Sequence, residues 1–198
     1  MKHSKFFPVC FDFDGVLLDF ASTVREVCKK FNVNIPDEPP KDFYFTNWFS
    51  EIDSSTYDKI IDTALQETSS SKPYEENIDY VRNIISASYI PVIVTSRSYI
   101  GPVNKWLKEY GLGKCLVLSS RHKEGDKASI VNALSLNVLV EDNPKYLDSF
   151  IQADPNNFAI IMSRPWNQNY SNDRSIRITE LKQLNSIFSR LSKIVQSL

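Results

Sequence analysis

The stretch Phe11-Asp12-Phe13-Asp14-Gly15-Val16-Leu17 decides most of what this chain can be. It ends an apolar run from Phe6 to Phe13 that is rich in Phe and too short for a helix, so we expect a buried strand there. Side chains alternate between the two faces of a strand, which turns Asp12 and Asp14 to the same face. Both also stand at the carboxyl end of the strand, where open parallel sheets bind their ligands.

These two neighbouring carboxylates need a physical reason. Burying like charges side by side is costly, and a strand with a purely structural role rarely has them there. A bound divalent cation would relieve the repulsion between Asp12 and Asp14. The alternative is that the two acids only make the strand end soluble in water. Later segments of the chain help to decide between a metal site and such a strand end.

Three later segments carry polar groups at the ends of apolar strands or at the start of a helix. Val92-Ile93-Val94-Thr95-Ser96-Arg97 ends a strand in hydroxyls that suit a phosphate oxygen. Gly125-Asp126-Lys127 brings a cation to the start of a helix, and Leu139-Val140-Glu141-Asp142-Asn143-Pro144 ends another strand in adjacent acids. Acids, hydroxyls and a cation at successive strand ends predict a Mg²⁺-assisted phosphoryl-transfer site.

The order of the expected elements predicts the fold class. From residue 90 onward, short apolar strands alternate with helices, a pattern typical of a parallel sheet covered on both sides. We therefore predict an α/β, Rossmann-like, three-layer fold with residues 1–20 and 89–198 in the core domain. Residues 21–88 interrupt the alternation with helices, the first of them capped by Ser22, and are predicted to form a small helical cap inserted after the first strand.

Composition restricts the partners of this 198-residue chain. Its formal net charge of −1 provides no basic excess for extended nucleic-acid binding or a polybasic membrane anchor. No apolar run approaches the roughly 18 residues of a membrane span, and the start MKHSKFF lacks the apolar segment of a secretory signal. Cys10, Cys28 and Cys115 are too widely spaced for a disulfide framework, which predicts a cytoplasmic protein. The sequence leaves open whether two chains pair as a homodimer.

With these motifs in this order, the sequence resembles the haloacid dehalogenase (HAD) superfamily of phosphatases over about residues 6–162. Within that superfamily it is most similar to the 5′(3′)-deoxyribonucleotidases. The segment from Asp12 to Phe20 is similar to their opening motif. Two further segments are similar to segments of these nucleotidases, namely Trp48-Phe49-Ser50-Glu51 in the cap, and Trp106 with Glu109-Tyr110-Gly111.

The resemblance implies roles for the acidic residues. Asp12 would be the nucleophile that forms an aspartyl-phosphate. Asp14 would be the general acid for the leaving alkoxide and then the base for the hydrolytic water. Asp12, the backbone carbonyl of Asp14 and the carboxylate of Asp142 would hold Mg²⁺. Glu141 would be either a further ligand through water or a residue that only contacts the ligands.

The phosphate-binding residues follow from the same resemblance. Thr95 and Lys127 would neutralise the phosphoryl charge as it shifts in the transition state, and Ser96 is a further phosphate-binding candidate. Lys123 competes with Lys127 for the role of the lysine. Arg121 and Lys123 together resemble a basic pair of the deoxyribonucleotidases, although a solvated surface explains them equally well.

Three residues are candidates for binding the rest of the substrate. Phe20 and Trp48 are predicted to flank a nucleotide base, while Phe43 and Phe45 are expected in the core of the cap itself. Arg97 stands where the nucleotidases have no cation, so it would contact a different part of the substrate. The segment Arg164-Pro165-Trp166-Asn167 has no explanation at this level.

The sequence thus predicts a Mg²⁺-dependent phosphomonoesterase that acts on small molecules, above all on (deoxy)ribonucleoside monophosphates. A second hypothesis keeps the chemistry and changes the substrate to a sugar phosphate or a 3′-phosphate on a nucleic-acid end. A third is a catalytically silent, partner-binding protein of the same fold, because fold alone does not establish function.

Overall fold

The structure, a computed structural model, describes residues 9–121 and 127–196. Its centre is a six-stranded sheet in the order β3-β2-β1-β4-β5-β6, and every neighbouring pair is parallel. The strands are β1 (Val9–Phe11), β2 (Val92–Thr95), β3 (Leu116–Ser119), β4 (Val138–Glu141), β5 (Phe158–Met162) and β6 (Ser175–Ile178). The order reverses between β1 and β4, and ligands bind at the carboxyl ends of strands beside such a reversal.

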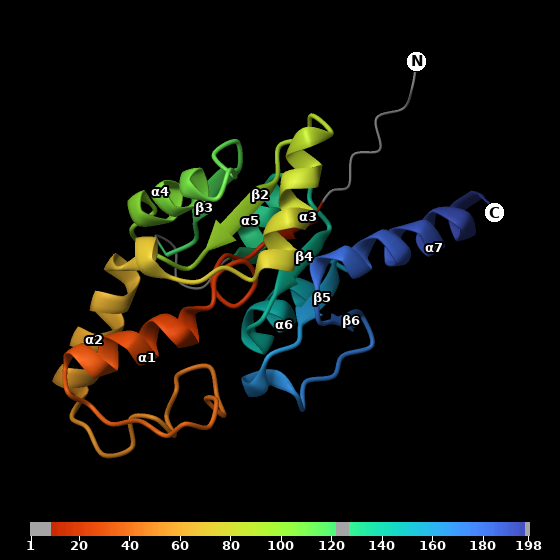
Figure 1. Cartoon of the computed structure of the whole chain (residues 1–198). Coiled ribbons are helices and arrows are strands. Elements are labelled where there is room, and N and C mark those ends of the chain that lie inside the picture. The colour runs from red at the N-terminus through yellow and green to blue at the C-terminus, as the bar shows by residue number, and fades with distance from the viewer. Residues whose placement is uncertain (1–8, 122–126, 197–198) are drawn as a thin grey trace.

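Helices cover both faces of this sheet (Figure 1). Phe11 of β1 packs in one cluster with Ile78 of α3, whereas its neighbour Cys10 packs in a second cluster with Phe150 of α6. Adjacent strand residues therefore face opposite layers, which confirms the predicted three-layer α/β fold. The helices are α1 (Phe20–Lys30), α2 (Ser54–Gln66), α3 (Glu75–Ser86), α4 (Gly101–Glu109), α5 (Lys127–Ala133), α6 (Pro144–Ala153) and α7 (Leu184–Gln196), with 3₁₀ turns at Thr68–Ser70, Pro165–Asn167 and Leu181–Gln183.

Helices α1 and α2 and the loop that joins them have an apolar cluster of their own, to which the loop contributes Phe45, Trp48 and Phe49. Helix α1 begins at Phe20, earlier than predicted. The Asp19 side chain accepts a hydrogen bond from the Ser22 backbone N–H at 3.0 Å, so Asp19 is the N-cap and the prediction of Ser22 as the cap is wrong.

Helix α3 lies against the sheet, although the sequence analysis includes it in the cap. Its residues Ile78 and Val81 are fully buried in the same cluster as Phe11. An apolar stripe predicts a helix with a buried face, but it does not say which surface that face meets. Among the described residues, the apolar cluster that is separate from the sheet therefore includes no residue of α3.

The carboxyl-terminal part adds β6, a strand that the sequence analysis does not predict. Ser175 and Arg177 alternate with Ile176 and Ile178 in this edge strand, so the apolar signal is only two residues long. None of the helices in the described part of the chain is both long enough and apolar enough to cross a membrane.

Candidate active site

A pocket of about 290 Å³ opens at the carboxyl ends of the central strands. Asp12 and Asp14 both line it, although β1 ends at Phe11, one residue before the first carboxylate. Gly15, Ser96, Arg97, Arg121, Asp142 and Tyr146 line the pocket from the core side, and Trp166 joins them. The other wall is apolar and mostly aromatic, and consists of Phe20, Phe43, Tyr44, Phe45, Tyr57, Ile61 and Leu65.

Asp12, Glu141 and Asp142 form a buried acidic cluster, in which one carboxylate oxygen from each residue lies within 4.8 Å of the other two. Pairing of β1 with β4 brings the cluster together, because Phe11 is in register with Val140. Burial, followed by repulsion from Glu141, raises the pKa values of both Asp12 and Asp142 well above their usual range. Oδ1 of Asp142 is buried and has no hydrogen-bond partner. A buried, unpartnered carboxylate oxygen in such a cluster fits a divalent cation, since Mg²⁺ prefers oxygen ligands.

Lys127 stands at the start of α5 and has its amine inside this cluster. Its Nζ donates to Oδ1 of Asp12 at 2.6 Å and also to Glu141, and its side chain is only 1% exposed. Burial alone would lower the pKa of Lys127, but the charges of Asp12 and Glu141 outweigh burial and raise it. Lys123, the competing candidate, lies outside the described residues.

Both carboxylate oxygens of Glu141 accept hydrogen bonds from other groups of the protein. Its Oε1 accepts the backbone N–H groups of Asp142 and Asn143, both at 3.0 Å, while its Oε2 accepts Lys127. These contacts favour the alternative in which Glu141 supports the ligands without being one.

Asp14 is bound on both carboxylate oxygens by Arg97. The Nε of Arg97 donates to Oδ2 at 2.7 Å and Nη2 donates to Oδ1 at 2.6 Å, which makes a bidentate ion pair. Nη1 of the same guanidinium donates to the carbonyl of Leu65 at 3.0 Å and to Thr68, on the segment that follows α2. Arg97 is 4% exposed, so its guanidinium is engaged by the protein rather than held out towards a substrate.

The two hydroxyls after β2 differ in their access to the pocket. Ser96 lines the pocket. Thr95 is completely buried, and its Oγ1 accepts the backbone N–H of Arg97 at 3.2 Å. Of the two predicted phosphate-binding hydroxyls, Ser96 therefore has the open position in this structure.

The aromatic wall differs from the predicted one. Phe20 lines the pocket, and so does Phe43, which was expected in the core of the cap. Phe45 belongs to the core of the cap, as expected, and also lines the pocket. Trp48, which was also predicted to flank a base, is not among the residues that line this pocket. Trp48 is 4% exposed, stacks on Phe45 at 5.3 Å between ring centroids, and donates its Nε1–H to the Glu38 carbonyl at 2.9 Å. A local sequence likeness does not determine which side of a small core a ring occupies.

No sequence pattern pointed to Trp166, which lines the pocket and donates its Nε1–H to Oδ2 of Asp142 at 3.0 Å. The same holds for Arg164, whose Nε donates to the carbonyl of Gly15 at 2.6 Å. Both belong to a short 3₁₀ turn and its flank, where no apolar periodicity points to a partner. The only signal is two large side chains in a segment without a predicted element.

Solved structures with a similar fold cover nearly the whole chain. A putative HAD-hydrolase, YfnB from Bacillus subtilis, crystallised with magnesium, has a TM-score of 0.64 at 15% identity and covers 91% of this chain and 97% of its own. A predicted phosphoglycolate phosphatase from Haemophilus somnus has a TM-score of 0.61 at 13% identity, covering 94% and 99%. A dehalogenase has a TM-score of 0.59 at 15% identity, covering 90% and 95%.

The fold is that of the HAD hydrolases. At these identities the likeness establishes the fold and leaves the reaction open, and it does not single out the deoxyribonucleotidases. No protein-family model matches the sequence, and no curated protein is similar to it.

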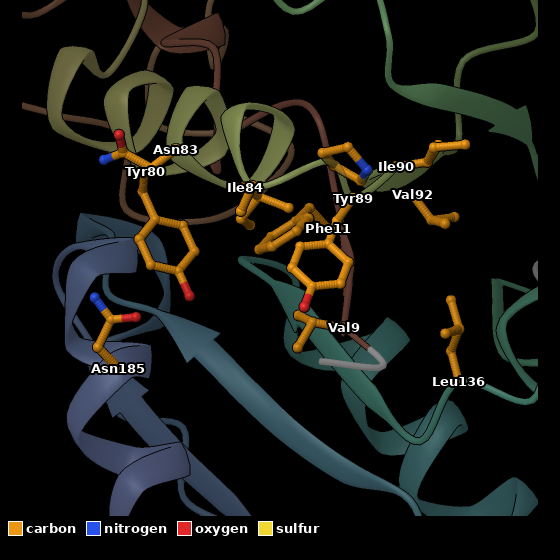
Figure 2. A pocket seen from close by; sticks show the side chains of 12 residues that line it. Val9, Phe11, Tyr80, Asn83, Ile84, Tyr89, Ile90, Val92, Leu136 and Asn185 are labelled. Atoms are coloured by element: carbon orange, nitrogen blue, oxygen red, sulfur yellow. The ribbon is translucent and has the colours of Figure 1, made fainter. Parts of the chain in front are cut away.

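A second cavity, of about 220 Å³, lies at the opposite edge of the sheet, beside the amino ends of β1 and β2 (Figure 2). Val9, Phe11, Ile84 and Val92 give it an apolar lining, and Tyr80, Asn83 and Asn185 stand to one side. Among the described residues that line it there is no carboxylate, amine, guanidinium, imidazole or thiol. The groups suited to catalysis are therefore at the carboxyl edge.

Proposed function

We propose that this protein is a Mg²⁺-dependent phosphomonoesterase that acts through an aspartyl-phosphate on Asp12. The observation that carries the proposal is the buried group of Asp12, Lys127 and Asp142, of which the two acids line the pocket and one oxygen of Asp142 is unpartnered. A dehalogenase needs a carboxylate nucleophile but no proton for its halide. A second carboxylate beside the first, and a cluster that fits a metal, favour phosphoryl transfer.

Different residues of the chain carry out different steps of the proposed reaction. A carboxylate oxygen of Asp12 attacks phosphorus, and the bond from phosphorus to the ester oxygen breaks. Asp14 gives a proton to the leaving alkoxide and later takes one from the water that hydrolyses the aspartyl-phosphate. Lys127 holds Asp12 in place and balances negative charge. Ser96 donates to a phosphoryl oxygen, and Thr95 supports the turn that presents it.

Asp12 and Asp142 would hold the metal, together with the backbone carbonyl of Asp14. When bound, a Mg²⁺ ion there would offset the charge of the phosphoryl oxygens. Lys127 alone cannot neutralise three buried carboxylates, and this supports the need for a further cation.

We propose nucleoside monophosphates as the substrate class. Aromatic and apolar residues line the pocket together with the carboxylates, and Phe20, Phe43 and Tyr44 are the candidates for stacking on a base. The segment between β1 and α3 acts as the cap that selects the substrate. Because the core supplies only phosphate chemistry, the cap decides between a nucleotide and a sugar phosphate.

The first experiment tests the chemistry with p-nitrophenyl phosphate. Asp12→Asn keeps the shape and removes the nucleophile, so turnover is expected to fall by at least about 10³-fold. EDTA should abolish wild-type turnover and Mg²⁺ should restore it. Asp79→Asn, an exposed acid paired with Arg82, is the matched control and should keep full activity. Full wild-type activity in EDTA would contradict the mechanism. So would an Asp12→Asn variant that keeps more than a tenth of the wild-type activity.

The second experiment tests the substrate class with 5′- and 3′-nucleoside monophosphates, sugar phosphates, phosphoglycolate, a 3′-phosphorylated oligonucleotide and a 2-haloacid. Tyr44→Ala removes a ring that is 58% exposed at the pocket, whereas Tyr99→Ala removes one that is 79% exposed outside it. Loss of one stacked ring should lower kcat/KM for a nucleotide by about 5-fold or more relative to p-nitrophenyl phosphate. Tyr99→Ala should change neither. Faster turnover of a sugar phosphate than of any nucleotide contradicts the substrate class alone.

A further inference from the structure

The segment Arg164-Pro165-Trp166-Asn167 touches both loops that carry the acidic residues. Arg164 donates to the carbonyl of Gly15 at 2.6 Å, in the turn that follows Asp14. Asn167 donates its Nδ2–H to the backbone carbonyl of Asp142 at 2.7 Å. One short turn after β5 therefore ties the loop after β1 to the loop after β4.

Trp166 adds the contact to the carboxylate itself. Its indole Nε1–H donates to Oδ2 of Asp142 at 3.0 Å, and Oδ1 of the same carboxylate is buried without a partner. An indole N–H only donates, so it occupies Oδ2 and leaves Oδ1 as the oxygen that is free to bind a cation. The carboxylate can no longer rotate freely without losing this hydrogen bond.

The position of the indole is set from two sides. Its ring meets the ring of Phe45 edge to face, at 6.2 Å and 81°. Phe45 has a left-handed backbone (φ 57°), a conformation that persists only when the surrounding structure holds it. From the core side, Asn167 fixes the turn through the Asp142 carbonyl and through the carbonyl of Met162 at 2.9 Å.

We propose that Trp166 is a positioning residue of the metal site, which orients Asp142 so that it coordinates a divalent cation through Oδ1 alone. The inference rests on the proposed function, because it assumes that Asp142 is a ligand. Groups that hold a metal ligand in this way usually contribute about 10- to 100-fold to metal affinity.

The experiment compares Trp166→Phe with Trp48→Phe. Both variants remove one indole N–H and keep a ring against Phe45, but only Trp166 donates to Asp142, since Trp48 donates to Glu38. Calorimetric titration with Mg²⁺ and no substrate is expected to show about 10- to 100-fold weaker binding for Trp166→Phe and wild-type binding for Trp48→Phe. In kinetics, the Mg²⁺ concentration for half-maximal rate should rise for Trp166→Phe, and saturating Mg²⁺ should restore most of kcat.

A measurement on the wild-type chain covers the case in which Trp166→Phe does not fold. With 5-fluorotryptophan in all three positions, fluorine NMR should show the Trp166 signal shifting on addition of Mg²⁺, while those of Trp48 and Trp106 stay in place. Wild-type Mg²⁺ affinity in Trp166→Phe, an equal loss in Trp48→Phe, or an unmoved Trp166 signal overturns the inference and leaves the proposed function intact. Absence of Mg²⁺ binding by the wild-type chain overturns both.

Discussion

At the scale of single residues, the pair of Asp14 and Arg97 bears most directly on the proposed chemistry. Both oxygens of Asp14 accept hydrogen bonds from the Arg97 guanidinium. A general acid needs a proton on one of those oxygens and a path to the leaving group. If Asp14 is the proposed general acid, it must therefore leave this pair, at least in part, during the reaction. Arg97 also donates to the Leu65 carbonyl in the last turn of α2 and to Thr68 just after it, so movement of this end of α2 would loosen its hold on Asp14.

Asp14→Asn separates the role in proton transfer from the ion pair. The variant should lose about 10²-fold or more in kcat on alkyl phosphates, because their leaving alkoxides need a proton. It should lose far less on p-nitrophenyl phosphate, whose leaving group is a weak base. Steady-state rates on both substrates, with thermal unfolding to follow the loss of the ion pair, provide the comparison. Equal losses on both substrates would show that Asp14 does not protonate the leaving group.

At the scale of elements, the turn after β1 has no room for a side chain. Gly15 has a φ of +72°, and a Cβ placed on it would lie 2.0 Å from Oδ2 of Asp142. Its carbonyl also accepts from Arg164. The turn is therefore shaped to bring the backbone close to the carboxylate that Trp166 holds.

Gly15→Ala is expected to damage the metal site more than the fold. Gly111→Ala is the matched control, because Gly111 has a similar φ of +74° but its added Cβ would meet nothing closer than 3.6 Å. The left-handed backbone should cost each variant about 1–2 kcal/mol of unfolding free energy. Only Gly15→Ala should also lose Mg²⁺ affinity, since it displaces Asp142. Denaturant unfolding and calorimetry check the two effects, and wild-type Mg²⁺ affinity in Gly15→Ala would contradict the geometry described for this turn.

At the scale of the whole molecule, all three cysteines are free thiols inside the folded structure. Burial raises the pKa of Cys28 to about 11 and that of Cys115 to about 12, from a usual value of 9.0. The unfolded chain loses these thiol protons near pH 9, whereas the folded chain keeps them. Between about pH 9 and pH 11 the folded state therefore binds more protons than the unfolded state.

Stability should fall as the pH rises through this window. Each such thiol lowers the unfolding free energy by at most about 1.4 kcal/mol per pH unit. Denaturant unfolding at pH 8, 9 and 10 measures the slope, and Cys115→Ala should make it shallower by removing one thiol whose pKa is raised in the folded chain. A slope that is unchanged in this variant would show that Cys115 ionises alike in the folded and unfolded chains.

Much of the fold follows from local sequence. Short apolar runs such as Val92–Thr95 predict strands, and the apolar stripes between them predict helices. The reason is that residues facing the core recur at a fixed spacing in each kind of element. The same spacing brings Asp12, Asp14 and Asp142 to the carboxyl edge of a parallel sheet, where the structure has them. Local spacing did not identify the edge strand β6, whose apolar signal is only two residues long.

Contacts between residues far apart in the chain depend on how the elements pack together. Lys127 meets Asp12 across 115 residues, Arg97 meets Asp14 across 83, and Arg164 meets Gly15 across 149. Local sequence patterns predict the α/β order, the acidic strand ends and the aromatic cap. Which cation meets which carboxylate, which ring faces the pocket, and the link from Trp166 to Asp142 depend on how the layers and the cap pack. Periodicity reports that a face is buried, and only packing determines what that face touches.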